Sequence, residues 1–532
     1  MASYDILIRN GKVVPGDGGP WVYADVGVKD GKIVKVGYIK GGQADVVVNA
    51  DGRFVAPGFI DIHNHSDLNI MAYPDATGAL LQGVTTVVVG NCGESVTPVL
   101  SETRHLLERY WSASYGFLPV KINWSTFREY LEHLEKARPA VNVAPLVGQG
   151  ALRIAVMGFE ARNPTVGELN RMKELLMGAM EDGAFGLSTG LIYPPGSFTT
   201  TDEIVELAKV VAGYGGIYAT HIRGESYSLI DAVKEAIEIG VRAGIPVQIS
   251  HHKAAGRDNW GKIKETLKLM VEARGRGVEV TCDAYPYTAA MTMLVATLPR
   301  WTQEGGVDAL IERIKNPSSR RKIAEYIETE VFTWENFIKL AGWDGIVISF
   351  SEKCKECEGR SIAEISKAWG MDPYETLFNI LLEDEAKSTM IMHLMQEDDV
   401  MEVLKHPLTM IGSDSWIVPL EGKPHPRFFG TFPRVLGRYV RDLAVLRLEE
   451  AVMKMTFMPA KKLGLEDRGL IAPGFKADIV VFDMKRIVDK ATFQKPTQLP
   501  EGIDYVLVNG MMAVEDGEIT RVRAGMILRK TS

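Results

Sequence analysis

The feature that most constrains the fold is an eightfold alternation of short apolar runs with segments of helical periodicity between residues 59 and 414. A short apolar run bounded by turn residues is typical of a buried strand, and apolar residues that recur every three or four positions are typical of a helix. Repeated strand–helix units build a parallel sheet, and eight of them predict a (β/α)8 barrel. The expected strands cover residues 59–65, 85–91, 141–147, 184–189, 216–222, 246–251, 278–285 and 409–414.

Both ends of the chain depart from this pattern. Residues 4–55 and the stretch after Gly474 contain short alternating apolar runs separated by turns, which predicts antiparallel strands. The gap between the seventh and eighth barrel strands is too long for one crossover helix, so we expect an insertion there. The predicted units are a small β-sandwich domain (1–57 and 467–532), a TIM-like barrel (58–289 and 345–466) and an inserted subdomain over the barrel mouth (290–344).

The composition of the chain argues against two kinds of binding partner, nucleic acid and membrane. A net charge of -8 over 532 residues, without a basic cluster, argues against nucleic acid. No run approaches the ~18 apolar residues of a membrane span, and the first residues lack a basic region followed by an apolar stretch. We expect a cytoplasmic protein whose partner is a small molecule. The sequence leaves open whether the chain forms a homo-oligomer.

Four cysteines in so long a chain do not indicate a disulfide framework. Cys354 and Cys357 form one Cys-x-x-Cys in a charged loop. A zinc site of this kind needs a second pair, which the sequence lacks, so we interpret the pair as incidental or as a local staple.

Residues with metal-binding side chains stand at the expected carboxyl ends of five barrel strands, where barrel enzymes place their active sites. On an extended strand, alternation would point His63 and His65 to the same face. Any one of these residues alone would be interpreted as a buried polar side chain. Together they predict a metal site, because imidazole and thiolate are the usual zinc ligands. The set is His63, His65, Cys92, His221, His251 and Asp414.

The motifs around these residues extend over nearly the whole chain. They are Pro57-Gly-Phe-Ile-Asp-Ile-His-Asn-His65, Gly90-Asn-Cys-Gly93, Gly186-Leu-Ser-Thr-Gly-Leu-Ile-Tyr193, Thr220-His-Ile-Arg-Gly-Glu225, Ile249-Ser-His-His-Lys253, Asp283-Ala-Tyr-Pro-Tyr287, Gly412-Ser-Asp414, His425-Pro-Arg427 and the late Gly469-Leu-Ile-Ala-Pro-Gly-Phe-Lys-Ala-Asp478. In these motifs the chain resembles the amidohydrolase superfamily, and within it the N-acyl-D-amino-acid deacylases, or D-aminoacylases.

The resemblance implies one tightly held zinc on Cys92, His221 and His251. His63, His65 and Asp414 would frame a second, weaker metal position. Many relatives bridge two metals with a carboxylated lysine on the fourth strand, but residues 183–190 contain no lysine. Cys92 is therefore expected to replace that bridge, and a thiolate is a soft anionic ligand that favours zinc. The neighbouring His252 must face the other side of its strand, so we assign it a structural role.

The expected reaction follows from such a site. Zinc lowers the pKa of a bound water to about 7 and polarises an amide carbonyl. Asp414 is expected to act as the general base that passes the proton to the leaving amine, with a plain metal ligand as the alternative. The resemblance assigns the substrate α-carboxylate to Arg427, with Tyr193 as its hydrogen-bonding partner. Lys253, Tyr285 and Tyr287 are further candidate substrate contacts.

The segment after the Tyr-Pro-Tyr motif bears on the substrate side chain. Relatives that prefer acyl-D-glutamate or acyl-D-aspartate add a cation there, whereas residues 289–295 of this chain are apolar. We therefore expect hydrophobic side chains such as those of D-Met, D-Leu or D-Phe. The alternative is that these residues only pack the insert onto the barrel.

The first hypothesis is thus a zinc-dependent hydrolase that converts N-acyl-D-amino acids to a carboxylate and a free D-amino acid. A cyclic-amide hydrolase, similar to hydantoinase or dihydropyrimidinase, is the second, and the missing lysine argues against it. The third is a non-catalytic scaffold, although scaffolds usually lose ligands that are all present here. The preference for D over L rests on the resemblance alone, because no residue pattern reports chirality.

Overall fold

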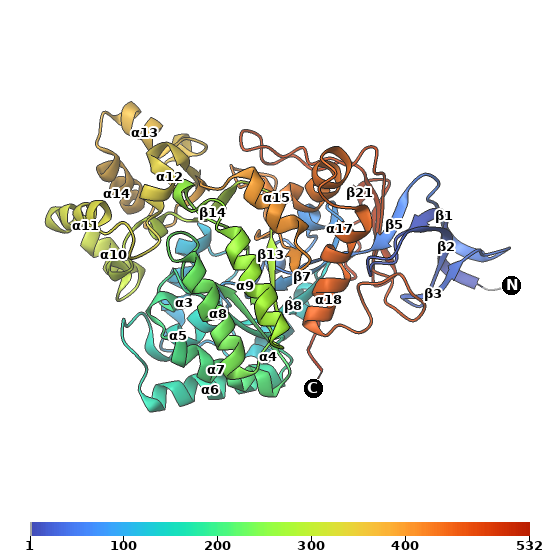
Figure 1. Ribbon diagram of the computed structural model, residues 1–532, viewed down its shortest axis with the longest axis horizontal. Coiled ribbons are helices and arrows are strands. Elements are labelled where there is room, and N and C mark those ends of the chain that lie inside the picture. The colour runs from blue at the N-terminus through green and yellow to red at the C-terminus, as the bar shows by residue number, and fades with distance from the viewer. Residues whose placement is uncertain (1–2, 532) are drawn as a thin grey trace.

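The computed structural model describes residues 3–531, and its central body is the predicted barrel (Figure 1). All eight predicted strands are present. They pair in parallel as two groups, β6-β7-β8 and β9-β10-β11-β12-β13-β17, where the short β9 (Val147–Gly148) continues β8. The barrel strands are β6 (Phe59–Asp61), β7 (Val84–Val89), β8 (Asn142–Pro145), β10 (Gly186–Gly190), β11 (Ile217–His221), β12 (Val247–Ile249), β13 (Val280–Ala284) and β17 (Thr409–Ile411).

The first strand is shorter than predicted. It ends at Asp61, and residues 62 and 63 form a bend, so His63 and His65 follow the strand instead of standing on it. The alternation argument for these two imidazoles was therefore wrong. Asp61 accepts hydrogen bonds from the backbone and hydroxyl of Ser413, at 2.8 and 2.5 Å, and from Asn64. Its carboxylate ties the first barrel strand to the eighth.

Helices cover the outside of the barrel (Figure 1), and two of them, α6 and α7, begin at a threonine whose side chain caps the helix. In α6, Thr165 and Glu168 form a capping box, which satisfies two backbone N–H groups that the helix leaves free. Helix α8 buries the face formed by Leu229, Val233 and Ile237. Each such side chain contributes about 1.5–3 kcal/mol when it leaves water. The main barrel helices are α6 (Val166–Glu181), α7 (Thr201–Gly213), α8 (Leu229–Ala243), α9 (Ile263–Gly275), α15 (Glu397–Lys405) and α17 (Leu448–Met455).

Strands from both ends of the chain build one nine-stranded sheet, as predicted, but the expectation of antiparallel pairing was only partly correct, because β1 pairs in parallel with β4 and with β5. Its order is β21-β20-β19-β18-β5-β1-β2-β3, and β4 pairs with β1. β5 and β18 join the two ends in antiparallel register, with Val55 opposite Val481. The domain boundaries stay a prediction. The strands are β1 (Ser3–Val13), β2 (Val22–Lys29), β3 (Lys32–Gly37), β4 (Gln43–Asn49), β5 (Phe54–Pro57), β18 (Ile479–Phe482), β19 (Ile503–Val508), β20 (Met511–Glu515) and β21 (Glu518–Ile519).

The region between the seventh and eighth barrel strands lies at the opposite end of the molecule from this sheet (Figure 1). It contains a three-stranded antiparallel sheet, β14-β16-β15, that the sequence did not reveal. Two of these strands lie beyond residue 344, the predicted end of the insert. Cys354 and Cys357 form a disulfide in the loop after β15, which agrees with a local staple. The elements are β14 (Ala289–Met293), β15 (Ile346–Phe350), β16 (Thr389–His393), α10 (Val307–Lys315), α11 (Pro317–Thr329), α12 (Phe337–Gly345), α13 (Ile362–Trp369) and α14 (Pro373–Glu383).

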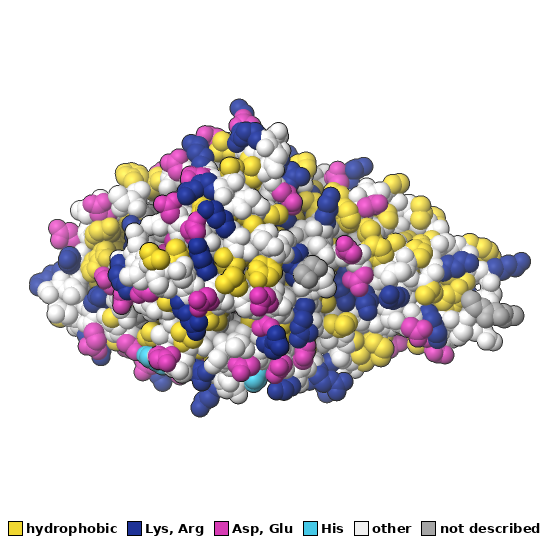
Figure 2. Space-filling model, turned by 90° about the horizontal axis from the view of Figure 1, so that it is seen from below, with side chains coloured by type: hydrophobic (Ala, Val, Ile, Leu, Met, Phe, Trp, Pro, Cys, Tyr) yellow, Lys and Arg dark blue, Asp and Glu magenta, His cyan; other side chains and the backbone are white. Residues whose placement is uncertain are grey.

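Acidic and basic side chains are mixed on the face seen in Figure 2, and neither sign gathers into a large patch there. Among residues 3–531, no helix has the length and hydropathy needed to cross a membrane.

A buried ion pair fastens two of the outer helices. Arg153 in α5 (Gln149–Met157) and Glu203 in the first turn of α7 are both fully buried, and Arg153 Nη1 lies 2.6 Å from Glu203 Oε2. We expect Arg153→Met to lower the free energy of unfolding by about 3–5 kcal/mol, because it leaves a buried carboxylate without its partner. Chemical denaturation would measure the loss. The exposed pair Arg171 and Glu174 supplies the control, and Arg171→Met should cost less than about 1 kcal/mol.

Candidate metal centre

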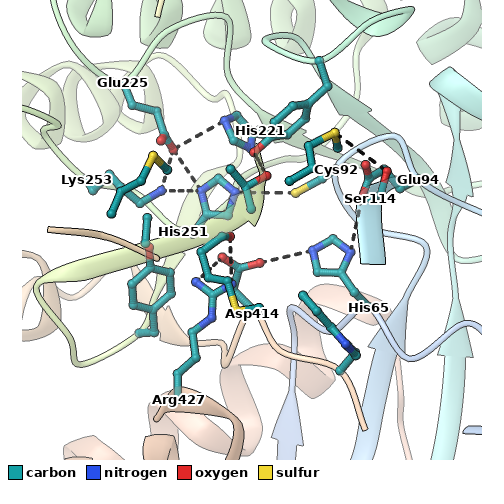
Figure 3. A pocket seen from close by; sticks show the side chains of 18 of the residues that line it. His65, Cys92, Glu94, Ser114, His221, Glu225, His251, Lys253, Asp414 and Arg427 are labelled. Atoms are coloured by element: carbon teal, nitrogen blue, oxygen red, sulfur yellow. Dashed lines mark hydrogen bonds and ion pairs between the residues drawn. The ribbon is translucent and has the colours of Figure 1, made fainter. Parts of the chain in front are cut away.

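The six predicted ligands converge at one end of the barrel, and Figure 3 shows five of them, all except His63. Within this cluster, three overlapping groups each keep their donor atoms within 4.8 Å of one another: Cys92 with His221 and His251, Cys92 with His63 and His65, and Asp414 with His63 and His251. Cys92 belongs to two of the groups. Its thiol lies 3.3 Å from His63 Nε2 and 3.5 Å from His251 Nε2, so it stands between two candidate cation positions.

The hydrogen bonding and protonation of Cys92, His221 and His251 suit a zinc ion. Neither ring nitrogen of His221 has a hydrogen-bond partner in the described part of the chain, although the side chain is buried. Such an orphaned polar group is costly unless a ligand satisfies it. Burial lowers the pKa of both His221 and His251 well below the usual value, so both imidazoles are neutral and can bind a cation.

The third member of this group is the Cys92 thiol, which must lose its proton to bind zinc. Burial, and then Asp414 and Glu94, raise the pKa of this thiol well above its usual value. An anionic sulfur in this place therefore requires a compensating cation, and a bound metal deprotonates a coordinating thiol. Two neutral imidazoles and one sulfur form a donor set that zinc prefers. Cys92, His221 and His251 therefore fit a zinc ion.

His63, His65 and Asp414 form the second part of the cluster. His63 Nε2 lies 3.3 Å from His65 Nε2, and His65 Nε2 lies 3.2 Å from Asp414 Oδ1. Asp414 Oδ1 is also 3.5 Å from His63 Nε2. This arrangement could hold a second cation next to the first, with Cys92 shared between the two positions.

Three of the six residues have unusual backbone conformations. Cys92, His251 and Asp414 have φ angles of +52°, +34° and +52°, in the left-handed region that residues other than glycine rarely adopt. Each such conformation costs about 1–3 kcal/mol and is typical of functional sites, where the surrounding structure imposes it. The strain turns each side chain from its strand end into the cluster.

Asp283, at the end of the seventh barrel strand, was quoted in a motif but not assigned a role. One oxygen accepts hydrogen bonds from His63 Nδ1 at 3.0 Å and from the backbone N–H of His251 at 2.8 Å. The other oxygen accepts from Gln248 at 2.8 Å. A proton held on His63 Nδ1 leaves Nε2 free to bind a metal, so Asp283 sets both the tautomer and the position of this ring.

We expect Asp283→Asn to weaken metal binding at the position next to His63 by about 10–100-fold, the usual effect of losing a partner of a ligating histidine. Equilibrium dialysis with Zn²⁺ or Co²⁺ would measure it. The control is Asp399→Asn, since the carboxylate of Asp399 is buried but, among residues 3–531, accepts hydrogen bonds from the backbone of Gly261 alone. Unchanged affinity in the Asp283 variant would contradict this role.

Two further carboxylates that the sequence analysis missed support the other rings. Glu225 Oε1 lies 3.0 Å from His251 Nδ1 and 2.6 Å from Lys253 Nζ. Glu94 accepts a 2.5 Å hydrogen bond from the Tyr115 hydroxyl, whose oxygen lies 3.1 Å from His65 Nδ1. The Tyr115 hydroxyl donates its hydrogen to Glu94 and accepts a hydrogen bond from His65 Nδ1. The Nε2 atom of His65 therefore carries no proton and is free to bind a metal.

Arg427 and Asp414 form a buried ion pair. Arg427 Nη1 lies 2.8 Å from Asp414 Oδ2, and the guanidinium also stacks on the Tyr285 ring at 4.8 Å. Burial opposes ionisation of Asp414, but Arg427 and the nearby imidazoles hold the pKa of this carboxyl well below its usual range. Asp414 is therefore an anion at neutral pH, with one oxygen on Arg427 and the other facing the histidines.

The remaining predicted contact residues surround a small space over the cluster, which we call the reaction chamber. Its volume is about 40 Å³. Lys253, Tyr285, Tyr193 and Arg427 all line it, together with Met291 of β14. The Tyr285 hydroxyl is buried without a partner in the described residues, and the Tyr193 hydroxyl accepts from Thr292 at 3.0 Å. The chamber thus joins the predicted substrate residues to the candidate ligands.

Two other residues lie outside the chamber. His252 lies beyond the end of β12, so the argument from strand alternation does not apply to it, and its ring bonds to Thr266 at 2.8 Å, a contact that suits a structural role. Tyr287, considered as a substrate contact, instead packs under Arg434, whose guanidinium is 4.8 Å from its ring.

Comparisons with known proteins place this geometry in context. A model of the amidohydrolase family matches residues 46–514. The D-aminoacylase of Alcaligenes xylosoxydans is 36% identical over 99% of this chain and 98% of its own length.

Solved structures agree with this result. The chain superposes on the N-acyl-D-glutamate deacylase of Bordetella bronchiseptica, solved with zinc and a phosphonate that mimics the tetrahedral intermediate. The TM-score is 0.83, with 36% identity over 99% of this chain and 100% of the other. A D-aminoacylase described as having a binuclear metal centre gives 0.84 at the same identity and coverage. The L-hydantoinase of Arthrobacter aurescens covers 99% of this chain and 100% of its own at 17% identity, with a TM-score of 0.56, and shows a shared fold alone.

Proposed function

Because the chain belongs to the amidohydrolase family, we propose that it is a zinc-dependent deacylase of N-acyl-D-amino acids. The observation that carries the proposal is the convergence of Cys92, His221 and His251 on one point beside Asp414. Relatives that are similar over their whole length bear the names D-aminoacylase and N-acyl-D-glutamate deacylase, and one was solved with zinc.

Cys92, His221 and His251 would hold the tightly bound zinc, and His63, His65 and Asp414 a second, weaker metal that shares Cys92. When bound, the metal supplies an acidified water and polarises the carbonyl of the substrate amide. The anionic charge of the thiolate offsets part of the metal charge in this buried place. Asp283 and Glu225 keep the imidazoles oriented for binding.

Asp414 would act as the general base. Its ionised carboxylate takes the proton of the attacking water on the oxygen that faces the histidines. It then delivers that proton to the nitrogen as the C–N bond breaks, which gives a carboxylate and a free amine. Arg427 keeps the other oxygen in place through the ion pair, so the carboxylate needs no reorientation during the reaction.

Arg427 and Lys253 would receive the α-carboxylate of the substrate. Both cations are buried at the chamber wall, and the Tyr285 ring lies between them, 4.8 Å from Arg427 and 5.7 Å from Lys253. The planar guanidinium suits bidentate contact with a carboxylate. Tyr193 lines the same chamber and adds a hydroxyl.

Residues of β14 would contact the substrate side chain. Ala290, Met291 and Met293 line the chamber, and none of them carries a charge. An acidic side chain would lose its hydration there without gaining a cation from β14. We therefore propose a preference for hydrophobic D-amino acids, in contrast to the glutamate named for one relative.

A cyclic-amide hydrolase remains the second candidate, and the low identity to the solved hydantoinase gives it only the support of a shared fold. The decisive experiment is one assay of the purified protein with N-acetyl-D-methionine, N-acetyl-L-methionine and a hydantoin, with bound zinc quantified. We expect cleavage of the D amide alone, about one tightly held zinc per chain, and loss of activity on chelation. Faster turnover of the hydantoin would reverse the order of the two candidates.

A further inference from the structure

A second cavity lies beside the reaction chamber, and we call it the outer cavity. Its volume is about 380 Å³, against about 40 Å³ for the chamber. Tyr115, Met291 and Trp416 line both, so the two spaces adjoin. The chamber is the smaller space, whereas the outer cavity has the size of a small-molecule site. One arm of the substrate can therefore enter the outer cavity.

The walls of the outer cavity are suited to an apolar chain. Tyr73, Phe117, Phe350, Val418 and Phe428 contribute aromatic and aliphatic surface. The ammonium of Lys355 lies 4.5 Å from the centre of the Phe350 ring, which holds the ring against the cavity.

The position of the charged groups decides which arm of the substrate enters. Lys253 lies on one side of the metal-binding imidazoles, and Glu94 lies on the other side with Ser114 (Figure 3). The shared wall residue Tyr115 is on the Glu94 side, where it contacts His65 and packs against Trp416 with ring centres 4.9 Å apart. A carboxylate held by Lys253 and Arg427 therefore leaves the opposite side of the amide, the acyl arm, directed toward the outer cavity.

We propose that the outer cavity binds the acyl chain, and that the favoured substrates are amides of D-amino acids with fatty acids of about six to ten carbons. The inference rests on the proposed deacylase function and specifies its substrate class. Water supplies the oxygen that bonds to the acyl carbon, the C–N bond breaks, and the nitrogen takes the proton. The products are a fatty-acid carboxylate and a D-amino acid, and no other reactant is required.

The first test compares kcat/KM of the zinc-loaded enzyme for N-acetyl-, N-hexanoyl- and N-octanoyl-D-leucine. Burial of one methylene corresponds to about a fourfold gain, so the octanoyl substrate should exceed the acetyl substrate by about tenfold or more even if burial is incomplete. Equal values for the three would overturn the proposal. Failure to cleave any of them, the acetyl compound included, would instead refute the deacylase function.

A cavity-filling variant gives the second test. Val418→Trp adds bulk at a residue that lines the outer cavity and that is not assigned to metal or substrate carboxylate. We expect kcat/KM for N-octanoyl-D-leucine to fall by about tenfold or more while the value for N-acetyl-D-leucine stays within about twofold. The control is Leu420→Trp, since Leu420 is 45% exposed on the same loop and does not line the cavity.

A different kinetic result is expected if the amino-acid side chain, instead of the acyl chain, occupies the outer cavity. If the amino-acid side chain enters the outer cavity, Val418→Trp will slow N-acetyl-D-tryptophan more than N-octanoyl-D-alanine, and the proposal fails. Phe350→Ala is a second variant that enlarges the cavity instead of filling it, so the test does not depend on the folding of the Trp variant alone. It should move the chain-length optimum to longer acyl groups, and an unchanged optimum would count against the proposal.

Discussion

Replacing Cys92 with alanine is expected to remove the tightly held zinc and to lower kcat/KM by about four orders of magnitude or more, since the catalysis depends on the metal. Cys92 is the only thiol in the cluster and belongs to two of its three candidate donor groups. Its loss leaves two neutral imidazoles at the first position and takes away the shared anion. Zinc content by mass spectrometry and initial rates with N-acetyl-D-methionine would measure both effects.

Cys282 provides the matched control for this variant. It is the other buried free cysteine among residues 3–531, and its thiol lies 3.3 Å from the Thr409 hydroxyl, away from the candidate ligands. Cys282→Ala should keep both zinc and activity. If the Cys92 variant kept a full complement of zinc and full activity, the assignment of the ligands would be refuted.

Replacing Asp414 with asparagine is expected to lower kcat by about 10²–10⁴-fold, the usual contribution of a general base. The tightly held zinc should remain, because Asp414 lies outside the group formed by Cys92, His221 and His251. KM should not rise, since the substitution leaves in place Arg427 and Lys253, the two cations proposed to receive the substrate carboxylate. Steady-state kinetics together with zinc analysis would separate these effects.

Asp489→Asn is the control, since Asp489 also forms an ion pair with an arginine, 2.9 Å from Arg434, but lies outside the chamber. That variant should retain its rate. Loss of the tight zinc from the Asp414 variant would favour the alternative role of this residue as a plain metal ligand. An unchanged kcat would exclude it as the base.

The sequence predicted the barrel and the composition of the cluster because both follow from one rule. Parallel strands end at the same edge, so polar residues that follow separate apolar runs, such as Cys92, His221 and Asp414, meet there. The number of strands and the residues at their ends are visible without coordinates. The proposed roles of these residues remain to be tested.

The supporting carboxylates could not be found in this way. Asp283 contacts His63 across 220 positions of the chain, and Glu94 acts on His65 through Tyr115, which is the last residue of a helix. Such partners are set by how helices and loops pack, which no local pattern encodes. The signal that was available is that Asp283 and Glu225 stand inside the same motifs as candidate ligands.

The three-stranded sheet of the insert was missed for a different reason. β16 reads Thr389-Met-Ile-Met-His393, a short apolar run among helical segments, and periodicity cannot distinguish such a run from part of a buried helix. Its partners β14 and β15 lie far away in the sequence, so only tertiary pairing reveals it. The omission matters for function, because β14 forms one wall of the reaction chamber.

The pairing of β5 with β18 has a consequence for biosynthesis. The early strands leave the ribosome long before their partners are translated, so the edge of β5 stays open throughout synthesis of the barrel. An unpaired edge invites association with other nascent chains. The sheet is completed only when the last segment emerges, and such distant contacts make folding slow. Chaperones that act during translation would therefore have to cover the edge of β5 until β18 has been synthesised.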